Sequence, residues 1–187
     1  VEATLIDCAI PMVLMRAADF GLSGDESPAA LNANRPLLEQ LRALRIEAGQ
    51  RMGIRDAAHR VVPKPVLLSV SQEERLRVRY FVSDHSHLPL AATGAVGIAT
   101  ACATPGTVAA ELGGSVRLPT TVVLDHPQGT LEVSLSHSEG SDAMRAGVVR
   151  TARRLFEGRV FVRPIARAVR AAITPAGSSL IPPAAPT

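Results

Sequence analysis

From Leu90 to Ala103 almost every side chain is small or apolar, and none is charged. A helix without a polar face has to be covered on all sides, so this stretch predicts a buried central helix. It is too short and too rich in Ala, Gly and Thr for a membrane span, which needs roughly 20 strongly apolar residues. Pro89 suits the first turn of such a helix, and Pro105-Gly106 would end it.

A polar cluster comes just before this helix. Asp84, His85, Ser86 and His87 form the densest group of titratable and hydroxyl side chains in the chain. The first N–H groups of a helix have no partner within the helix and attract negative charge. We therefore expect a site for an anion here, most simply a carboxylate.

A second helix is predicted between Asn34, which is placed to cap it, and Gly53, which would end it. Apolar side chains recur there at helical spacing, at Leu37, Leu38, Leu41, Leu44, Ala48 and Met52. This pattern is typical of an outer amphipathic helix, with Arg42, Arg45 and Arg51 on or near the solvent side.

Short apolar or alternating runs predict the strands, and residues 21–34 predict a surface loop. The expected strands are residues 4–7, 12–15, 66–70, 75–82, 120–124, 130–136, 146–150 and 159–162. Six or more strands with one buried helix indicate an α+β, barrel-like domain in which a sheet curls around the helix. Such curling removes most exposed sheet edges.

The composition fits one globular domain, with 47% hydrophobic and 20% charged residues. Nineteen of the 20 basic residues are arginine, and Lys64, between two prolines at a strand entrance, is the only lysine. Lysine can lose its proton when buried, whereas arginine effectively cannot. Lys64 is therefore either a functional group or a surface residue left by chance.

Charge and cysteine content narrow the functional classes. The net charge of +3 is modest and no aromatic residues alternate with the arginines, so nucleic acid is not an expected partner. Arg150 and Arg153 lie in a charged segment that either binds carboxylates or forms a solvated turn. Cys8 and Cys102 lack metal-ligand spacing, and Cys102 is expected to pack as a small hydrophobe.

The two ends of the chain give expectations about its location and its domain boundaries. No signal peptide or lipidation motif is found, which favours a cytoplasmic setting. The chain begins at Val1 rather than at methionine, which suggests a fragment or a processed product. Residues 164–187 are basic and then rich in Pro and Ala, and predict a disordered tail after a domain of residues 1–163.

Six segments resemble, in the same order, the C-terminal half of the PrpF family, and within it most of all the 4-oxalomesaconate tautomerases. They are residues 4–13, 45–53, 62–65, 86–108, 126–129 and 150–158. The resemblance covers roughly residues 3–163. It implies the diaminopimelate-epimerase-like fold, in which two similar domains, each a β-barrel around a central helix, face each other across a cleft. The two helix N-termini then point at a bound polycarboxylate.

The resemblance also implies a reaction, the movement of a proton and a double bond in an unsaturated di- or tricarboxylate without a cofactor. The family's acid/base lysine and cysteine come mainly from an N-terminal half that this chain lacks, so no catalytic residue is assigned. Expected substrate-binding residues are Ser86, His87, Lys64, Arg150 and Arg153. Where the tautomerases have Cys-His, this chain has Ser86-His87, which offers no thiolate.

The resemblance implies as partners the missing N-terminal domain and a second copy of the chain, because a domain without its other half exposes apolar surface. Two alternatives stay open. The substrate is 2-methylaconitate instead, or the chain is a truncated carboxylate-binding domain without catalysis.

Overall fold

The computed structural model describes residues 1–71, 73, 75–114, 116–150, 153–159 and 161. The chain forms two compact units, Val1–Arg150 and Thr151–Thr187. All helices and strands described here belong to the first unit, and the described residues of the second carry none. Arg159 and Phe161 therefore do not form the predicted strand, and the predicted tail at 164–187 lies outside the described residues.

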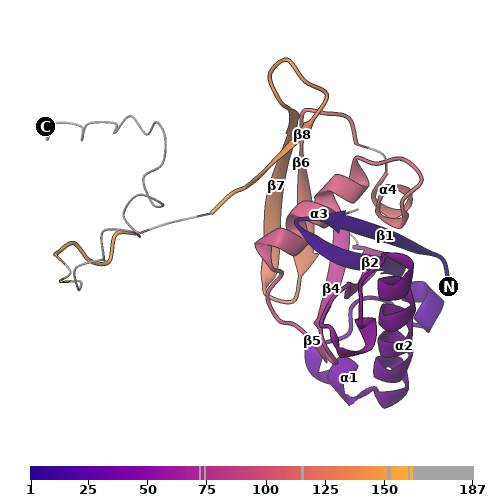
Figure 1. The fold of residues 1–187 in the computed structure, drawn as a ribbon. Helices are drawn as coiled ribbons and strands as arrows, with labels where there is room; N and C mark the ends of the chain where they lie inside the picture. The colour runs from indigo at the N-terminus through magenta and orange to yellow at the C-terminus, as the bar shows by residue number, and fades with distance from the viewer. Residues whose placement is uncertain (72, 74, 115, 151–152, 160, 162–187) are drawn as a thin grey trace, which may run out of the picture. The chain divides into compact units, whose positions relative to one another are not determined.

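A single mixed sheet builds the first unit (Figure 1). Its strands are β1 (Ala3–Cys8), β2 (Ile10–Arg16), β3 (Lys64–Val70), β4 (Leu76–Val82), β5 (His85–Ser86), β6 (Thr120–His126), β7 (Gly129–His137) and β8 (Met144–Val148). They are ordered β1-β2-β3-β4-β6-β7-β8, with β5 beside the end of β4. The β2–β3 and β4–β6 pairs are parallel, and the others are antiparallel.

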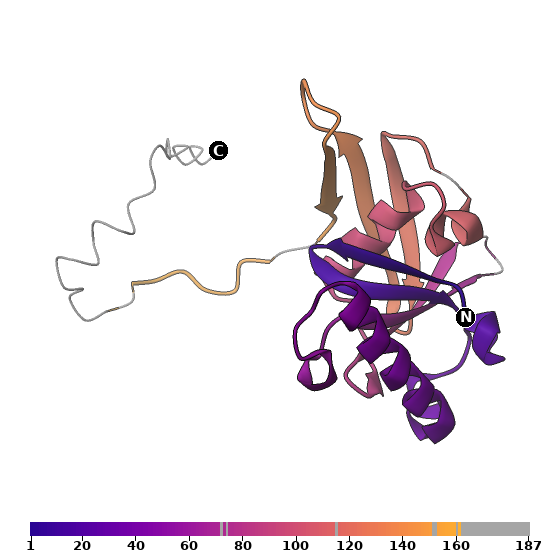
Figure 2. The ribbon, with the colours of Figure 1, turned by 45° about the vertical axis from the view of Figure 1, so that its right-hand side comes forward.

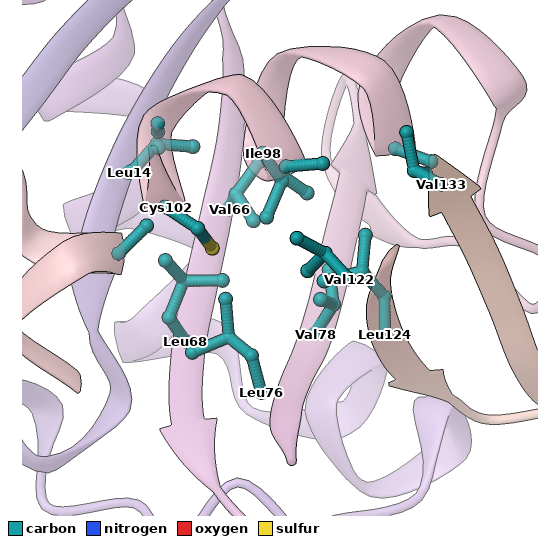
Figure 3. Packing of buried hydrophobic residues seen from close by; sticks show 14 of the residues in the cluster. Leu14, Val66, Leu68, Leu76, Val78, Ile98, Cys102, Val122, Leu124 and Val133 are labelled. Carbon is teal, nitrogen blue, oxygen red and sulfur yellow. The ribbon is translucent and has the colours of Figure 1, made fainter. Parts of the chain in front are cut away.

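Helix α3 (Ala92–Cys102) is the centre of the unit. It contacts β1 and β2 at one end of the sheet and β6, β7 and β8 at the other, and Figure 2 shows it between the β1–β2 hairpin and these later strands. Figure 3 shows Ile98 and Cys102 pointing at aliphatic side chains of β3, β4 and β6. The predicted α+β sheet around a buried helix is confirmed, as a curled sheet with β1 and β8 at its two ends.

An outer layer covers the other face of the sheet. Helix α2 (Arg35–Arg51) packs its apolar stripe on Val13, Met15, Leu67 and Phe81. Asn34 caps α2 as predicted, since its Oδ1 accepts a hydrogen bond of 3.2 Å from the Leu37 N–H. The shorter elements are α1 (Pro28–Ala33), α4 (Val108–Gly113) and two 3₁₀ turns, η1 (Ala17–Phe20) and η2 (Ala57–His59).

Four expectations about the helices are corrected. Helix α1 lies inside the predicted loop, where Ser27 caps it, and α4 was not expected. Helix α3 is shorter than predicted: Ala91 is its N-cap and Cys102 its last residue, so Pro89 lies before the first turn rather than in it. Arg45 is 5% exposed rather than on the solvent side, because it lies on the stripe of α2 that includes Leu41 and Ala48.

Candidate functional site

The N-terminus of α3 is uncapped. Ala91 has no side chain that could accept a hydrogen bond, and Ala91, Ala92 and Thr93 are exposed. The first main-chain bond in the helix runs from Ala95 N–H to Ala91 C=O, so the preceding N–H groups are left without a helical partner. These groups and the helix dipole place partial positive charge where α3 meets solvent.

The register of β3 places Lys64 on the sheet face that packs on α3. It is the first residue of β3 and pairs with Met12 of β2, whose Cε lies close to Gly97 of α3. Two residues further along β3, Val66 pairs with Tyr80, whose ring lies close to Gly94. Alternate residues of a strand share a face, so Lys64 shares with Val66 the sheet face that packs on α3.

The Lys64 side chain is largely buried, and its amine has no partner among the described residues. Its residue is 7% exposed, and among the described residues no hydrogen bond or ion pair to the Lys64 side chain is found. Burial, and then the positive charge of Arg45, hold the pKa of Lys64 below its usual value. An incoming carboxylate would supply the missing counter-charge, and a neutral amine at this position could accept a proton.

Ser86 lies on the other face of the sheet. It pairs with Phe81, which packs against the α2 layer, and facing residues of an antiparallel pair share a face. Its N–H donates to Asn32 Oδ1 at 2.7 Å, while its buried Oγ has no partner among the described residues. The strand register therefore places Ser86 and Lys64 on opposite faces of the sheet.

His87 closes the turn that leads into α3. Its N–H donates to the Tyr80 carbonyl at 2.7 Å, and its exposed ring Nδ1 lies 2.9 Å from the Pro89 carbonyl oxygen. This geometry places His87 at the approach to the helix N-terminus. Arg150 is exposed at the end of the first unit, and Arg153 is exposed in the second.

Two further residues near Lys64 escaped the sequence reasoning. Tyr80 is buried against Gly94, and burial raises the pKa of its phenol, which keeps it neutral. Arg45 is buried close enough to Lys64 to act on its pKa. The signal for Arg45 was available, since positions 41, 45 and 48 fall on one helix face.

Other chemistry is limited in the part of the chain that the structure describes. No group of three or more His, Cys, Asp or Glu side chains there could hold a metal ion. Cys102 packs as a small hydrophobe, as expected, and burial raises its pKa to about 11. What remains as a candidate anion site is the group of free N–H groups at the start of α3, which packs on the sheet face that also carries Lys64.

Comparisons with known proteins agree with the segments found in the sequence. Residues 1–163 match the family described as PrpF protein. A putative isomerase, YbhH, of Escherichia coli strain K12 is 42% identical over 165 residues, which cover 87% of this chain and 47% of that protein. A 4-oxalomesaconate tautomerase of Pseudomonas putida is 38% identical over 168 residues, covering 87% of this chain and 45% of the relative.

Among solved structures, a methylitaconate-Δ-isomerase superposes with a TM-score of 0.76 at 23% identity, over 96% of this chain and 50% of that one. This likeness supports the fold. The chain spans about half the length of the relatives that it matches. Within the described residues, every helix is too short or too polar to cross a membrane.

Proposed function

Because the chain belongs to the PrpF family, we propose that it forms the C-terminal domain of an isomerase that moves a proton and a double bond in an unsaturated tricarboxylate. The favoured substrate is 4-oxalomesaconate, an intermediate of aromatic-acid breakdown. The observation that carries this proposal is the uncapped N-terminus of α3, together with Lys64 on the sheet face that packs on α3, whose amine has no partner among the described residues. Helix N–H groups and one ammonium are complementary to a carboxylate.

Each group has a role in this proposal. The N–H groups of Ala92, Thr93 and Gly94 bind one substrate carboxylate, and Lys64 pairs with that carboxylate or with the enolate oxygen formed when a neighbouring carbon loses its proton. Positive charge aimed at a developing enolate lowers the barrier to that proton transfer. His87 and Arg150 bind outer carboxylates.

The rest of the site belongs to a second domain. In the diaminopimelate-epimerase-like arrangement that we propose, an N-terminal domain of the same fold faces α3 across a cleft and supplies the acid and base that move the proton. No cofactor takes part, and the enzyme works in the cytoplasm. The half-length match to the relatives supports this division.

Two alternatives remain as candidates. Isomerisation of 2-methylaconitate uses the same carboxylate site, and the far end of the substrate distinguishes the two. A carboxylate-binding domain without catalysis is favoured by Ser86, which stands where the tautomerases have cysteine and has no thiolate to offer.

Binding is tested by NMR titration of the ¹⁵N-labelled chain with 4-oxalomesaconate and with propane-1,2,3-tricarboxylate. The amide signals of Ala92, Thr93 and Gly94 are expected to shift first, and Lys64→Met is expected to weaken binding about tenfold or more, as expected for loss of a buried charge partner. Arg51→Met is the matched control, because it removes one positive charge from an exposed ion pair on α2. Equal affinities of the two variants would exclude Lys64 from the site.

Catalysis is tested by proton exchange in D₂O with 4-oxalomesaconate. The chain is assayed alone and after addition of a separately expressed N-terminal domain from a related tautomerase. Deuterium incorporation only with both halves supports the isomerase. Binding without exchange, in a complex shown to form, favours the non-catalytic domain.

A further inference from the structure

Arg45 is a buried arginine that bonds to main-chain oxygens. Its Nη1 donates to the Ala57 carbonyl at 2.8 Å and to the Arg60 carbonyl, and its Nη2 donates to the Ala58 carbonyl at 3.4 Å. Among the described residues no carboxylate forms an ion pair with it. An apolar side chain of similar size would fill this position without the cost of desolvating a charge, so packing alone does not explain an arginine here.

The three carbonyl groups belong to the segment that leads to Lys64. Residues 57–59 form η2, and Arg60 lies four positions before Lys64. One turn along α2 from Arg45, a Cβ on Gly49 would lie 2.7 Å from Ala57 Cβ and 3.2 Å from Pro63 Cδ. Helix α2 therefore holds this segment at both ends and fixes where β3 begins.

We propose that Arg45 is a positioning residue for Lys64, because its guanidinium fixes the chain at residues 57–60 and so sets where the lysine enters β3 under α3. The proposal rests on the proposed function for the role of Lys64. The charge of Arg45 acts in the same place, since it adds to burial in lowering the pKa of Lys64. The other titratable groups on the two strands beside β3 are Arg16 in β2 and Arg77, Arg79 and Tyr80 in β4. Those of the segment that leads into β3 are Arg55, Asp56, His59 and Arg60.

The test exploits Lys64 as the only lysine of the chain. In a chain grown with ¹³C-labelled lysine, a single side-chain Cε signal reports the titration of Lys64. Arg45→Gln removes the charge and keeps donors, whereas Arg45→Met removes both. Arg51→Gln is the control, because Arg51 is 71% exposed on the same helix.

Both Arg45 variants are expected to raise the titration midpoint of Lys64 clearly above those of the wild-type chain and of Arg51→Gln. Amide hydrogen exchange at residues 57–64 is expected to quicken in Arg45→Met, more than in Arg45→Gln. A midpoint unchanged in a variant that keeps the native amide spectrum would overturn the proposal.

Two measurements on the wild-type chain keep the test decisive if both variants unfold. The Arg45 guanidinium protons are expected to exchange slowly with water and to show Overhauser contacts to Ala57, and Lys64 is expected to titrate below an ordinary lysine. Rapid exchange or an ordinary titration would overturn the proposal. Neither measurement uses a carboxylate ligand. If both give the expected result but the chain does not bind tricarboxylates, the proposed function is refuted and the positioning role of Arg45 stands.

Discussion

At the scale of single residues, Lys64 serves the proposed function but lowers the stability of the folded chain. A buried amine without a partner disfavours its charged form, so the unfolded chain binds a proton at Lys64 more tightly than the folded chain does. Below the pKa that Lys64 has in the folded chain, the lysine is protonated in both the folded and the unfolded chain. The folded chain is then destabilised by the full free-energy cost of burying the charge. Stability therefore rises as the pH increases from the lowered folded pKa of Lys64 towards the unfolded value near 10.5.

Lys64→Met is expected to stabilise the isolated chain by about 1 kcal/mol near pH 7, since it replaces a buried polar group by an apolar one of similar length. The gain should shrink as the pH rises past 10.5, where the lysine becomes neutral in both states. Urea unfolding at the two pH values measures the difference. A variant less stable than the wild type at pH 7 would mean that the amine has a partner in the folded chain.

At the scale of elements, the position of α3 depends on two glycines. A Cβ on Gly97 would overlap Met12 Cε and lie 2.9 Å from the Cys8 carbonyl oxygen, which is main chain and cannot yield easily. A Cβ on Gly94 would lie 2.8 Å from the Tyr80 ring. Close approach of α3 to β1, β2 and β4 therefore requires these glycines.

Gly97→Ala is expected to destabilise the chain by about 1–3 kcal/mol, the usual cost of overpacking a core. Gly113→Ala at the end of α4 is the matched control, because its nearest heavy atom would be 3.9 Å away. It should be neutral or slightly stabilising, since alanine favours a helix. Chemical denaturation of both variants compares them, and equal stabilities would show that α3 can move away from β1.

The elements differ in how far the sequence predicts them. Helices α2 and α3 and the β6–β7 hairpin are predicted because each has a local pattern, respectively an apolar stripe, an uncharged run and an alternation around a turn. Helices α1 and α4 have six residues each, too few to show a period. The parallel β2–β3 and β4–β6 pairs join distant segments, and no local pattern specifies them.

The residues of the candidate site also differ in how far the sequence predicts them. The proposed anion site at the N-terminus of α3 is expected from the uncharged run and the polar cluster before it, and Lys64 stands out as the only lysine. The face on which a strand residue lies depends on register, which is why the sequence grouped Ser86 with His87 and Lys64 while the structure separates it from Lys64. Arg45 was missed because a charged residue was assumed to face solvent.

At the scale of the whole molecule, the exposed apolar side chains predict association. The large hydrophobic residues exposed in the first unit are Val1, Leu5, Val61, Val70, Leu88, Met144 and Val149. Leu88 follows His87 directly and lies just before α3, at the end of the unit where we propose that a second domain binds.

The purified chain is therefore expected to form dimers or larger species, with a mass that rises with concentration above 19.6 kDa in light scattering. Leu88→Ser should reduce this association. A mass of 19.6 kDa at every concentration would contradict the expectation of a homo-oligomer and weaken the two-domain proposal.

The central position of α3 has a consequence for biosynthesis. The helix comes from the middle of the chain but is enclosed by its first strands and its last, so the core cannot close until β8 has been synthesised. Folds that depend on such distant contacts form slowly. During translation the apolar surfaces of the β1–β2 hairpin and α3 therefore stay exposed to solvent until β8 follows. Chaperones bind nascent chains in this state.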